Sequence, residues 1–146
     1  MRPMSSKAFT LVEILIVVVI LGILAAIVIP AFNSTVQDSA ATTTYSELQK
    51  LRRHVGVFKA RNGDNLPNVT AGDGQTGWGE LVSADHFLQA PINAWVGGAN
   101  ARVIVVVPNA VPDAAFHTNY GWIYDPNNGE IYAAGFDGDD EPLPRP

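Results

Sequence analysis

The sequence predicts an α+β fold in which one long N-terminal helix precedes a small antiparallel β-sheet. The first observation is an apolar run, residues 9–30, in which Glu13 is the single charged side chain. The second is that apolar residues continue beyond this run at spacings of three and four, as on one face of a helix. The third is a set of short β-branched and aromatic segments near the C-terminus. Together they predict that the second half of the helix packs on one face of the sheet.

The apolar run has about the length of a membrane-spanning helix, which needs roughly 20 apolar residues. Lipid offers no partners to backbone groups, so the run is expected to be helical. It is a plain membrane anchor, a secretory signal peptide, or an apolar helix behind a short leader that is cut before Phe9. A plain anchor has no use for Glu13, and the run is longer than the apolar core of a secretory signal. Arg2 and Lys7 precede the run, which predicts a cytoplasmic N-terminus.

The helical pattern continues to about Arg61, where Asn62, Gly63 and Asp64 supply a stop signal. We therefore expect one helix from about Phe9 to about Arg61. Two residues weaken it: Pro30 removes a backbone hydrogen bond, and Gly22 adds backbone freedom. The apolar residues that share one face beyond the run are Phe32, Val36, Ala40, Leu48, Leu51, Val55 and Phe58.

Three segments of the C-terminal part are predicted strands: residues 102–107, 118–124 and 130–133. The turn-forming residues 125–129 separate the last two, which predicts a hairpin. Residues 65–79 are rich in Gly, Asn and Asp and predict a loop, followed by a short helix or turn over residues 78–88. Trp78, Phe87 and Trp95 are expected to anchor the core.

Composition and motifs exclude several classes of function. The formal net charge of −5 argues against nucleic acid as the main partner, because phosphate binding needs clustered Lys and Arg. The chain has no cysteine and no recognisable nucleophile or zinc-binding motif. Its three histidines, His54, His86 and His117, are scattered. We therefore expect that the protein is not an enzyme.

Residues 7–15, Lys-Ala-Phe-Thr-Leu-Val-Glu-Ile-Leu, resemble the class III signal of type IV pilins and type II secretion pseudopilins. Gly22 and Pro30 fall where this family usually has a Gly and a Pro. The family usually has Gly before the cut, where this chain has Ala8, which is also small. The resemblance implies that prepilin peptidase cuts between Ala8 and Phe9 and that Phe9 is then N-methylated.

The resemblance also implies a domain organisation and a fold. Residues 1–8 form the leader, residues 9–30 a transmembrane and filament-core helix, and residues 31–146 a periplasmic globular domain of the pilin-like α+β type. The protein is expected in the inner membrane as a single-pass protein with its N-terminus in the cytoplasm, and afterwards in a periplasmic filament. In assembled filaments of this family the segment between Gly22 and Pro30 is often partly melted.

Glu13 is the expected assembly residue. A cut before Phe9 creates an ammonium group four residues before Glu13, and residues four apart share one helical face. This pairing lowers the cost of a carboxylate in lipid. The resemblance implies that in a filament the amine of an incoming subunit meets Glu13 of its neighbour. The alternative is that Glu13 only marks the membrane interface.

The function that the resemblance implies is structural: a subunit of a type II secretion pseudopilus, which polymerises through its N-terminal helix and assists protein export across the outer membrane. Its implied partners are copies of itself, minor pseudopilins, prepilin peptidase, an inner-membrane assembly platform and the membrane. A partial match of residues 91–98 to a Pro-x-Asp/Asn-Pro-Trp-Gly phrase of major pseudopilins favours this assignment. The alternatives are a type IV pilus subunit for adhesion, motility or DNA uptake, and a membrane-tethered binding module.

The C-terminal tail is acidic, with Asp137, Asp139 and Asp140 close together. Calcium binds several oxygen ligands at once, and major pseudopilins carry a calcium site after their last strand, which residues 135–138 resemble. Calcium is therefore one hypothesis for these three residues. A solvated acidic tail without an ion is the favoured interpretation.

Overall fold

The computed structural model describes residues 9–69, 77–82 and 89–146, and for residues 30–33 it describes the helical backbone alone. The chain divides into two compact units, Met1–Gln37 and Asp38–Pro146. This division reflects packing, whereas the predicted boundary after residue 30 marks the end of the apolar run and stays a prediction. The predicted leader with Ala8, the histidine His86 and the predicted core residue Phe87 lie outside the described residues.

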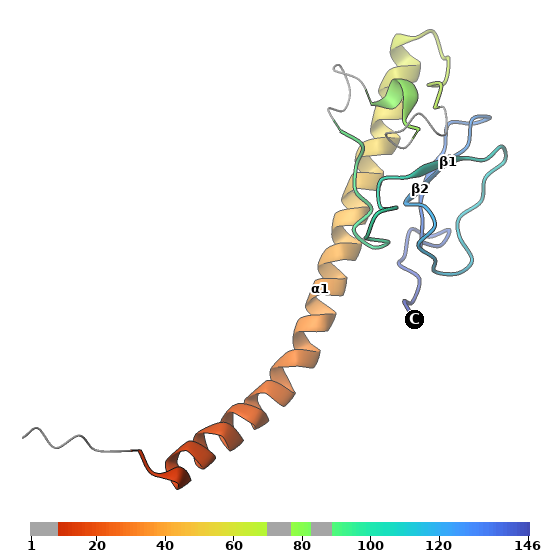
Figure 1. Cartoon of the computed structure of the whole chain (residues 1–146). Coiled ribbons are helices and arrows are strands. Elements are labelled where there is room, and N and C mark those ends of the chain that lie inside the picture. Colours follow the sequence, from red (N-terminus) through yellow and green to blue (C-terminus); the bar gives the residue numbers. More distant parts are fainter. Residues whose placement is uncertain (1–8, 70–76, 83–88) are drawn as a thin grey trace, which may run out of the picture. The chain divides into compact units, whose positions relative to one another are not determined.

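One α-helix, α1 (Leu11–Arg61), contains both the apolar run and its amphipathic continuation (Figure 1). The long helix is therefore confirmed; it begins at Leu11 rather than Phe9 and ends at the expected residue. Beyond its end, Gly63 and Asp64 have positive φ angles of 62° and 70°. The Asp64 N–H donates to the Lys59 carbonyl at 2.9 Å, so a left-handed turn closes the helix.

Both predicted weak points lie inside α1. A Cβ atom built at Gly22 would meet no atom within 4 Å, so no contact within the chain requires glycine there. Pro30 has no N–H to donate to the carbonyl one turn earlier. The weakening of the helix at Gly22 and Pro30 stays a prediction.

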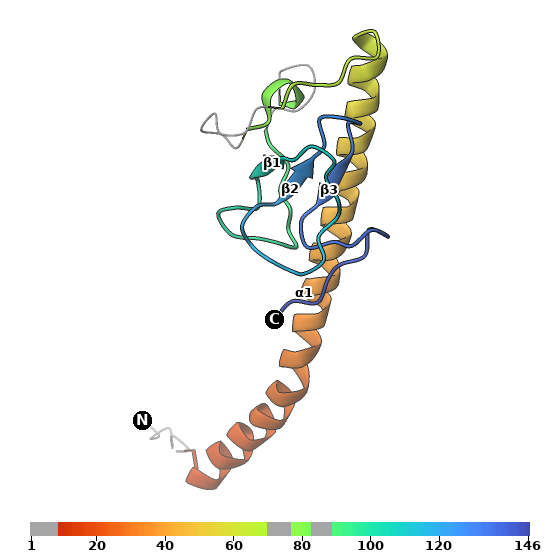
Figure 2. The same cartoon turned by 90° about the vertical axis from the view of Figure 1, so that its right-hand side faces the viewer.

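Three short strands form a mixed sheet in the order β1–β2–β3 (Figure 2): β1 (Ile104–Val106), β2 (Trp122–Tyr124) and β3 (Ile131–Ala133). Strands β2 and β3 are antiparallel, so the predicted hairpin is confirmed. Strand β1 runs parallel to β2, so the prediction of an all-antiparallel sheet is wrong for this strand. The reason is the connection, because residues 107–121 are long enough to return the chain to the starting end of β1, as parallel pairing requires.

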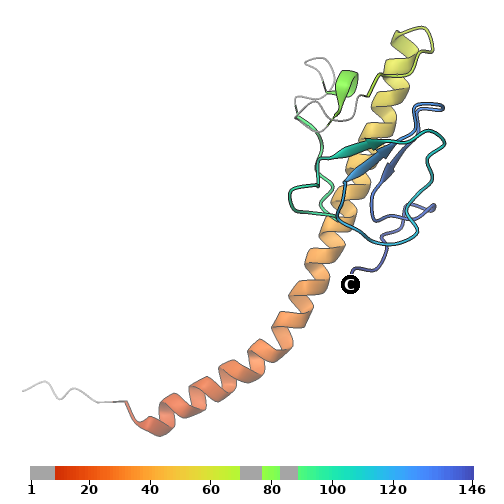
Figure 3. The same ribbon diagram turned by 45° about the vertical axis from the view of Figure 1, so that its right-hand side comes forward.

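The hydrophobic core lies between the sheet and the part of α1 within residues 38–61 (Figure 3). Leu48 and Leu51 of α1 are fully buried, as predicted for this face of the helix. In β2, Trp122 is also fully buried, and Trp78 contacts it edge to face with ring centroids 6.3 Å apart. Trp78 precedes a short 3₁₀-helix, η1 (Gly79–Leu81). The remaining members of the core cluster are Val55, Val69, Leu81, Trp95, Ile104, Tyr124, Ile131, Ala133 and Phe136.

A buried polar cluster, which the sequence did not indicate, joins α1 to the open end of the hairpin, where β2 begins and β3 ends. The Asn93 side-chain amide donates to the carbonyls of Gly121 and Ala134 at 2.7 and 2.9 Å. The Thr44 hydroxyl accepts the Trp95 N–H at 2.9 Å and lies 3.3 Å from Asn93 Oδ1. Asn93 and Thr44 are fully buried. Their polar groups have no contact with water, so these hydrogen bonds supply the partners that water would give.

Thr44→Val should destabilise the 38–146 unit by about 1–3 kcal/mol, because it leaves the buried Trp95 N–H without an acceptor. Thr43→Val is the matched control: the Thr43 hydroxyl is exposed and bonds only to the Ser39 carbonyl of its own helix. We expect less than about 0.5 kcal/mol for the control. Chemical unfolding followed by tryptophan fluorescence measures both, and equal losses for the two variants would contradict the role of the cluster.

Candidate functional site

The first candidate region is the apolar part of α1. The side chains of residues 11–29 are all exposed within the chain. An 18-residue window of this helix has a mean hydropathy of 3.3 and none of it is buried. By length and composition, α1 is able to cross a membrane. An apolar surface of this size needs lipid or other protein around it.

The start of α1 is capped by a side chain. The Glu13 N–H donates to Thr10 Oγ1 at 3.2 Å, so Thr10 is the N-cap and Glu13 is the third helical residue. The negative charge of Glu13 then lies in the first turn, where the helix dipole favours it. Phe9 precedes the helix and is exposed. The helical spacing that we expected between Phe9 and Glu13 is therefore absent from the chain as described, and their pairing stays a proposal.

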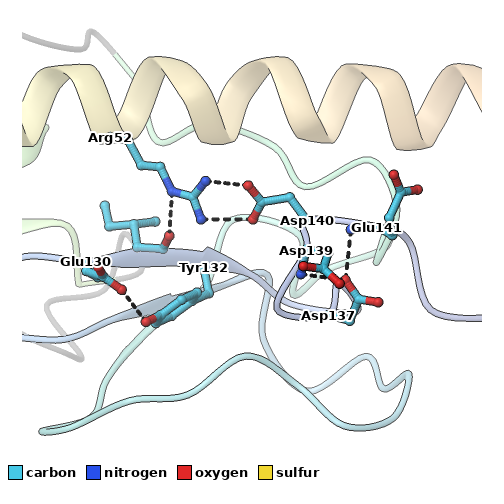
Figure 4. Close-up of polar contacts among 8 residues, drawn as sticks. Arg52, Glu130, Tyr132, Asp137, Asp139, Asp140 and Glu141 are labelled. Carbon is cyan, nitrogen blue, oxygen red and sulfur yellow. Dashed lines mark hydrogen bonds and ion pairs between the residues drawn. The ribbon is translucent and has the colours of Figure 1, made fainter.

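The second candidate region is the C-terminal loop with Asp137, Asp139 and Asp140 (Figure 4). Asp137 Oδ1 accepts the N–H groups of Asp139 and Glu141 at 2.9 and 3.0 Å. Both carboxylate oxygens of Asp140 bind the Arg52 guanidinium, at 2.5 and 2.8 Å. Asp139 is exposed. Two of the three carboxylates thus already have partners in the chain.

These contacts do not fit the calcium hypothesis. Calcium requires several oxygens directed at one point. In the part of the chain that the structure describes, no group of three or more His, Cys, Asp or Glu side chains is placed to hold a metal ion. The proposed ligands Asp137, Asp139 and Asp140 bind the backbone, face solvent and bind Arg52, respectively.

The acidic tail that we expected to be solvated is exposed at Asp139 and Glu141 but packed at its two ends. Phe136 is buried and packs edge to face against Trp95, with ring centroids 6.3 Å apart. The Trp95 indole N–H donates to the Leu143 carbonyl at 3.2 Å, and the Arg145 guanidinium lies over the Trp95 ring at 4.2 Å. Phe136 precedes the acidic residues of the tail, and Leu143 and Arg145 follow them. These three residues pack the tail against the domain, which the acidic composition of the tail did not indicate.

Two open grooves flank the ion pair between Arg52 and Asp140. One has a volume of about 500 Å³ and is lined by α1 side chains, Tyr45 among them, and by residues 139–142. The other has a volume of about 690 Å³ and is lined by both members of the pair and by Tyr132. Neither groove is lined by a histidine or a serine, so neither offers a serine or histidine nucleophile.

One of the described histidines, His117, belongs to a polar cluster around Asp113. His117 Nε2 lies 2.9 Å from Asp113 Oδ2, and the same carboxylate accepts the N–H of Gly135 at 2.9 Å and the Tyr120 hydroxyl at 3.2 Å. Burial and the neighbouring Asp113 raise the pKa of Tyr120. This cluster ties the connection between β1 and β2 to the end of β3.

The sequence reasoning missed Arg52. No role was expected for this residue. The available signal was position: Arg52 follows the buried Leu51 and lies at the flank of the apolar face, where a long side chain is able to reach the edge of a packed sheet.

Two tyrosines titrate late. Burial raises the pKa of Tyr124 to about 12; its hydroxyl donates to the Pro67 carbonyl at 3.0 Å. The pKa of Tyr132 is raised to about 12 by its hydrogen bond to Glu130. In the unfolded chain a tyrosine has a pKa of about 10.

The 38–146 unit should therefore lose stability as the pH rises from 10 to 12. The unfolded chain releases these protons first, so the stabilisation is complete below pH 10 and is lost as the pH passes the folded value of about 12. Tyrosinate absorbance and tryptophan fluorescence, recorded together, measure ionisation and unfolding. Tyr124→Phe should remove one late-titrating group, and a wild-type titration complete near pH 10 would contradict these assignments.

The comparisons with known proteins agree with the N-terminal resemblance. The model of the prokaryotic N-terminal methylation motif matches residues 3–29. A type IV major fimbrial protein FimA of Dichelobacter nodosus is 46% identical over 74 residues, which cover 49% of this chain and 42% of that protein. The type II secretion system core protein G of Pseudomonas aeruginosa is 36% identical over 62 residues, 42% of this chain and 44% of that protein. Another FimA of D. nodosus is 46% identical over 109 residues, 73% of this chain and 65% of that protein.

The chain spans less than half the length of the first two of these relatives. No solved structure matches it. The relatives are named as fimbrial proteins and as a secretion-system core protein, and none is named as an enzyme, in agreement with the expectation from the sequence. Both kinds of relative are present, so the likeness does not separate a pilus from a pseudopilus.

Proposed function

Because the chain is type IV pilin-like in its N-terminal motif and its fold, we propose that it is a structural subunit of a filament that assembles through its N-terminal helix. The observation that carries this proposal is the exposed apolar surface of residues 11–29. Burial of apolar surface contributes roughly 25 cal/mol per Å². An exposed apolar helix of this kind is therefore stable only when lipid or neighbouring helices surround it. A filament subunit is surrounded first by lipid in the membrane and then by neighbouring helices in the filament.

The finer proposal is a type II secretion pseudopilus, which assists protein export across the outer membrane. The similarity to a secretion-system core protein G and the partial match of residues 91–98 support it. The absence of cysteine excludes a C-terminal disulfide within the sequence given. A type IV pilus subunit is the second candidate, supported by the longer match to a fimbrial protein.

A membrane-tethered binding module has less support. Such a module would need exposed aromatic residues of the sheet as its receptor surface. Trp122 and Tyr124 are fully buried in the core, and Tyr132 is only partly exposed. The strand aromatics within the described residues therefore stabilise the fold and present little surface to a ligand.

The location and partners follow from the proposed role. The protein rests in the inner membrane as a single-pass protein with its N-terminus in the cytoplasm, and residues 31–146 face the periplasm. Prepilin peptidase cuts it between Ala8 and Phe9, and an inner-membrane assembly platform moves it into a periplasmic filament of identical subunits with minor pseudopilins. The cations that precede the apolar run support this orientation.

Deletion of the gene, followed by complementation with the full chain, tests the function. Loss of protein secretion with unchanged surface fibres is the expected result for a pseudopilus subunit. Loss of surface fibres with normal secretion would replace it with the pilus assignment. Unchanged secretion and unchanged fibres would overturn both and leave the binding module.

Glu13→Val should be processed and inserted like the wild type but assemble poorly. The Thr10 cap uses the backbone N–H of residue 13, so the substitution removes only the carboxylate that we propose to pair with the amine of Phe9. A contact of about 1.4 kcal/mol changes an equilibrium tenfold, so the yield of sheared filaments should fall by about that factor or more. Glu13→Asp should be intermediate.

Intact-mass measurement on membrane-extracted protein checks processing in the same samples: the expected chain starts at an N-methylated Phe9. Asp64→Asn is the matched control, since it removes an exposed carboxylate of the other unit. Wild-type filament yield from Glu13→Val at equal membrane levels would rule out the pairing. A mass that corresponds to a start at Met1 or Arg2 would rule out the cut.

A further inference from the structure

The C-terminal loop concentrates negative charge. Residues 137–141 contain four carboxylates, Asp137, Asp139, Asp140 and Glu141. Like charges at this spacing repel each other and disfavour a compact loop unless a cation lies among them. The loop is nevertheless folded by its own backbone, since the Asp137 N–H donates to the Glu141 carbonyl at 3.0 Å. A positive charge within the fold or from solution would offset this repulsion.

Arg52 of α1 supplies that charge with directed geometry. Figure 4 shows its guanidinium facing Asp140, and the two bonds of 2.5 and 2.8 Å are bidentate. A third donor, Arg52 Nε, binds the Ile131 carbonyl of β3 at 3.2 Å. The Arg52 and Asp140 side chains are 33% and 20% exposed, so the pair is partly shielded from water. Bidentate, charge-assisted pairs are among the stronger hydrogen bonds in proteins.

The loop backbone directs Asp140 towards the helix. Asp140 has a positive φ of 61°, a conformation that Asp and Asn adopt more readily than other residues with a side chain. Asp137 Oδ1 holds the turn by accepting the N–H groups of Asp139 and Glu141. The turn and the guanidinium thus fit each other without an additional ligand.

We propose that Arg52 is the resident cation of the C-terminal loop. It takes the role that a bound divalent ion would have among these carboxylates, and it fastens residues 135–146 to α1. The fold of the 38–146 unit is then independent of calcium. Asp140 lines both grooves, and Arg52 lines one of them.

Competition by calcium is unfavourable for a physical reason. An ion would need to displace Arg52 from both oxygens of Asp140, whereas at Asp137 the backbone N–H groups occupy Oδ1 alone. The two exposed carboxylates, Asp139 and Glu141, offer at most four oxygens of the six to eight ligands that calcium takes.

Thermal melts of the full chain in detergent, with millimolar calcium chloride or with EDTA, test the proposal. Every tryptophan and tyrosine of the chain lies in residues 38–146, so tryptophan fluorescence reports this unit alone. The wild-type Tm should be the same in both solutions. Arg52→Gln and Asp140→Asn should each lower it by roughly 4–8 °C, and the double variant should be no worse than either single one.

Arg53→Gln is the matched control, since Arg53 is the next residue of α1 and is exposed; its Tm should equal that of the wild type. Asp140→Asn keeps a residue that tolerates the positive φ, so it serves if Arg52→Gln does not fold. A rise of the wild-type Tm in calcium of several degrees would overturn the proposal. So would an Asp140→Asn Tm equal to that of Arg53→Gln, or additive losses in the double variant. None of these readings depends on filament assembly, so the proposed function is tested separately.

Discussion

A helix satisfies its own backbone hydrogen bonds, and α1 depends on this property in two different surroundings. Within residues 11–29 the helix is apolar on all sides except at Glu13, and it is exposed in the chain. This is tolerable in lipid because no backbone group needs water. Within residues 38–61 only one face is apolar, and Leu48 and Leu51 on that face form the floor of the core. One secondary structure thus serves first as a membrane element and then as the scaffold of the domain.

The sheet is too small to be stable without that scaffold. Each strand has three residues, and sheets of this size need a packed face. The helix supplies the apolar surface on which the sheet packs. Asn93 and Thr44 form hydrogen bonds with backbone groups that this packing would otherwise bury without a partner. Buried polar clusters of this kind specify one arrangement, since any other register leaves donors unpaired. The long connections on either side of the hairpin are thereby held in place.

The C-terminal tail is held by aromatic packing at one place and by an ion pair at another. Its aromatic and cationic residues, Phe136 and Arg145, fasten it around Trp95, whereas its acidic turn faces Arg52. The tail is thus held to Arg52 of α1 and to Trp95 without a disulfide. In a cysteine-free domain of this size, such side-chain anchors carry a stabilising role that cross-links often have in small exported domains.

The sequence by itself determined the N-terminal helix, its end at Arg61, the hairpin and the pilin-like motif. These depend on periodicity, turn residues and local spacing, which act between residues close in the chain. Only the tertiary structure decided the parallel pairing of β1, the burial of Asn93 and the partner of Asp140. Each of these joins residues far apart in the chain; Arg52 and Asp140, for example, are 88 positions apart. The acidic tail resembled an ion site because composition records charge, whereas whether a guanidinium or a metal meets that charge depends on how the helix and the loop pack together.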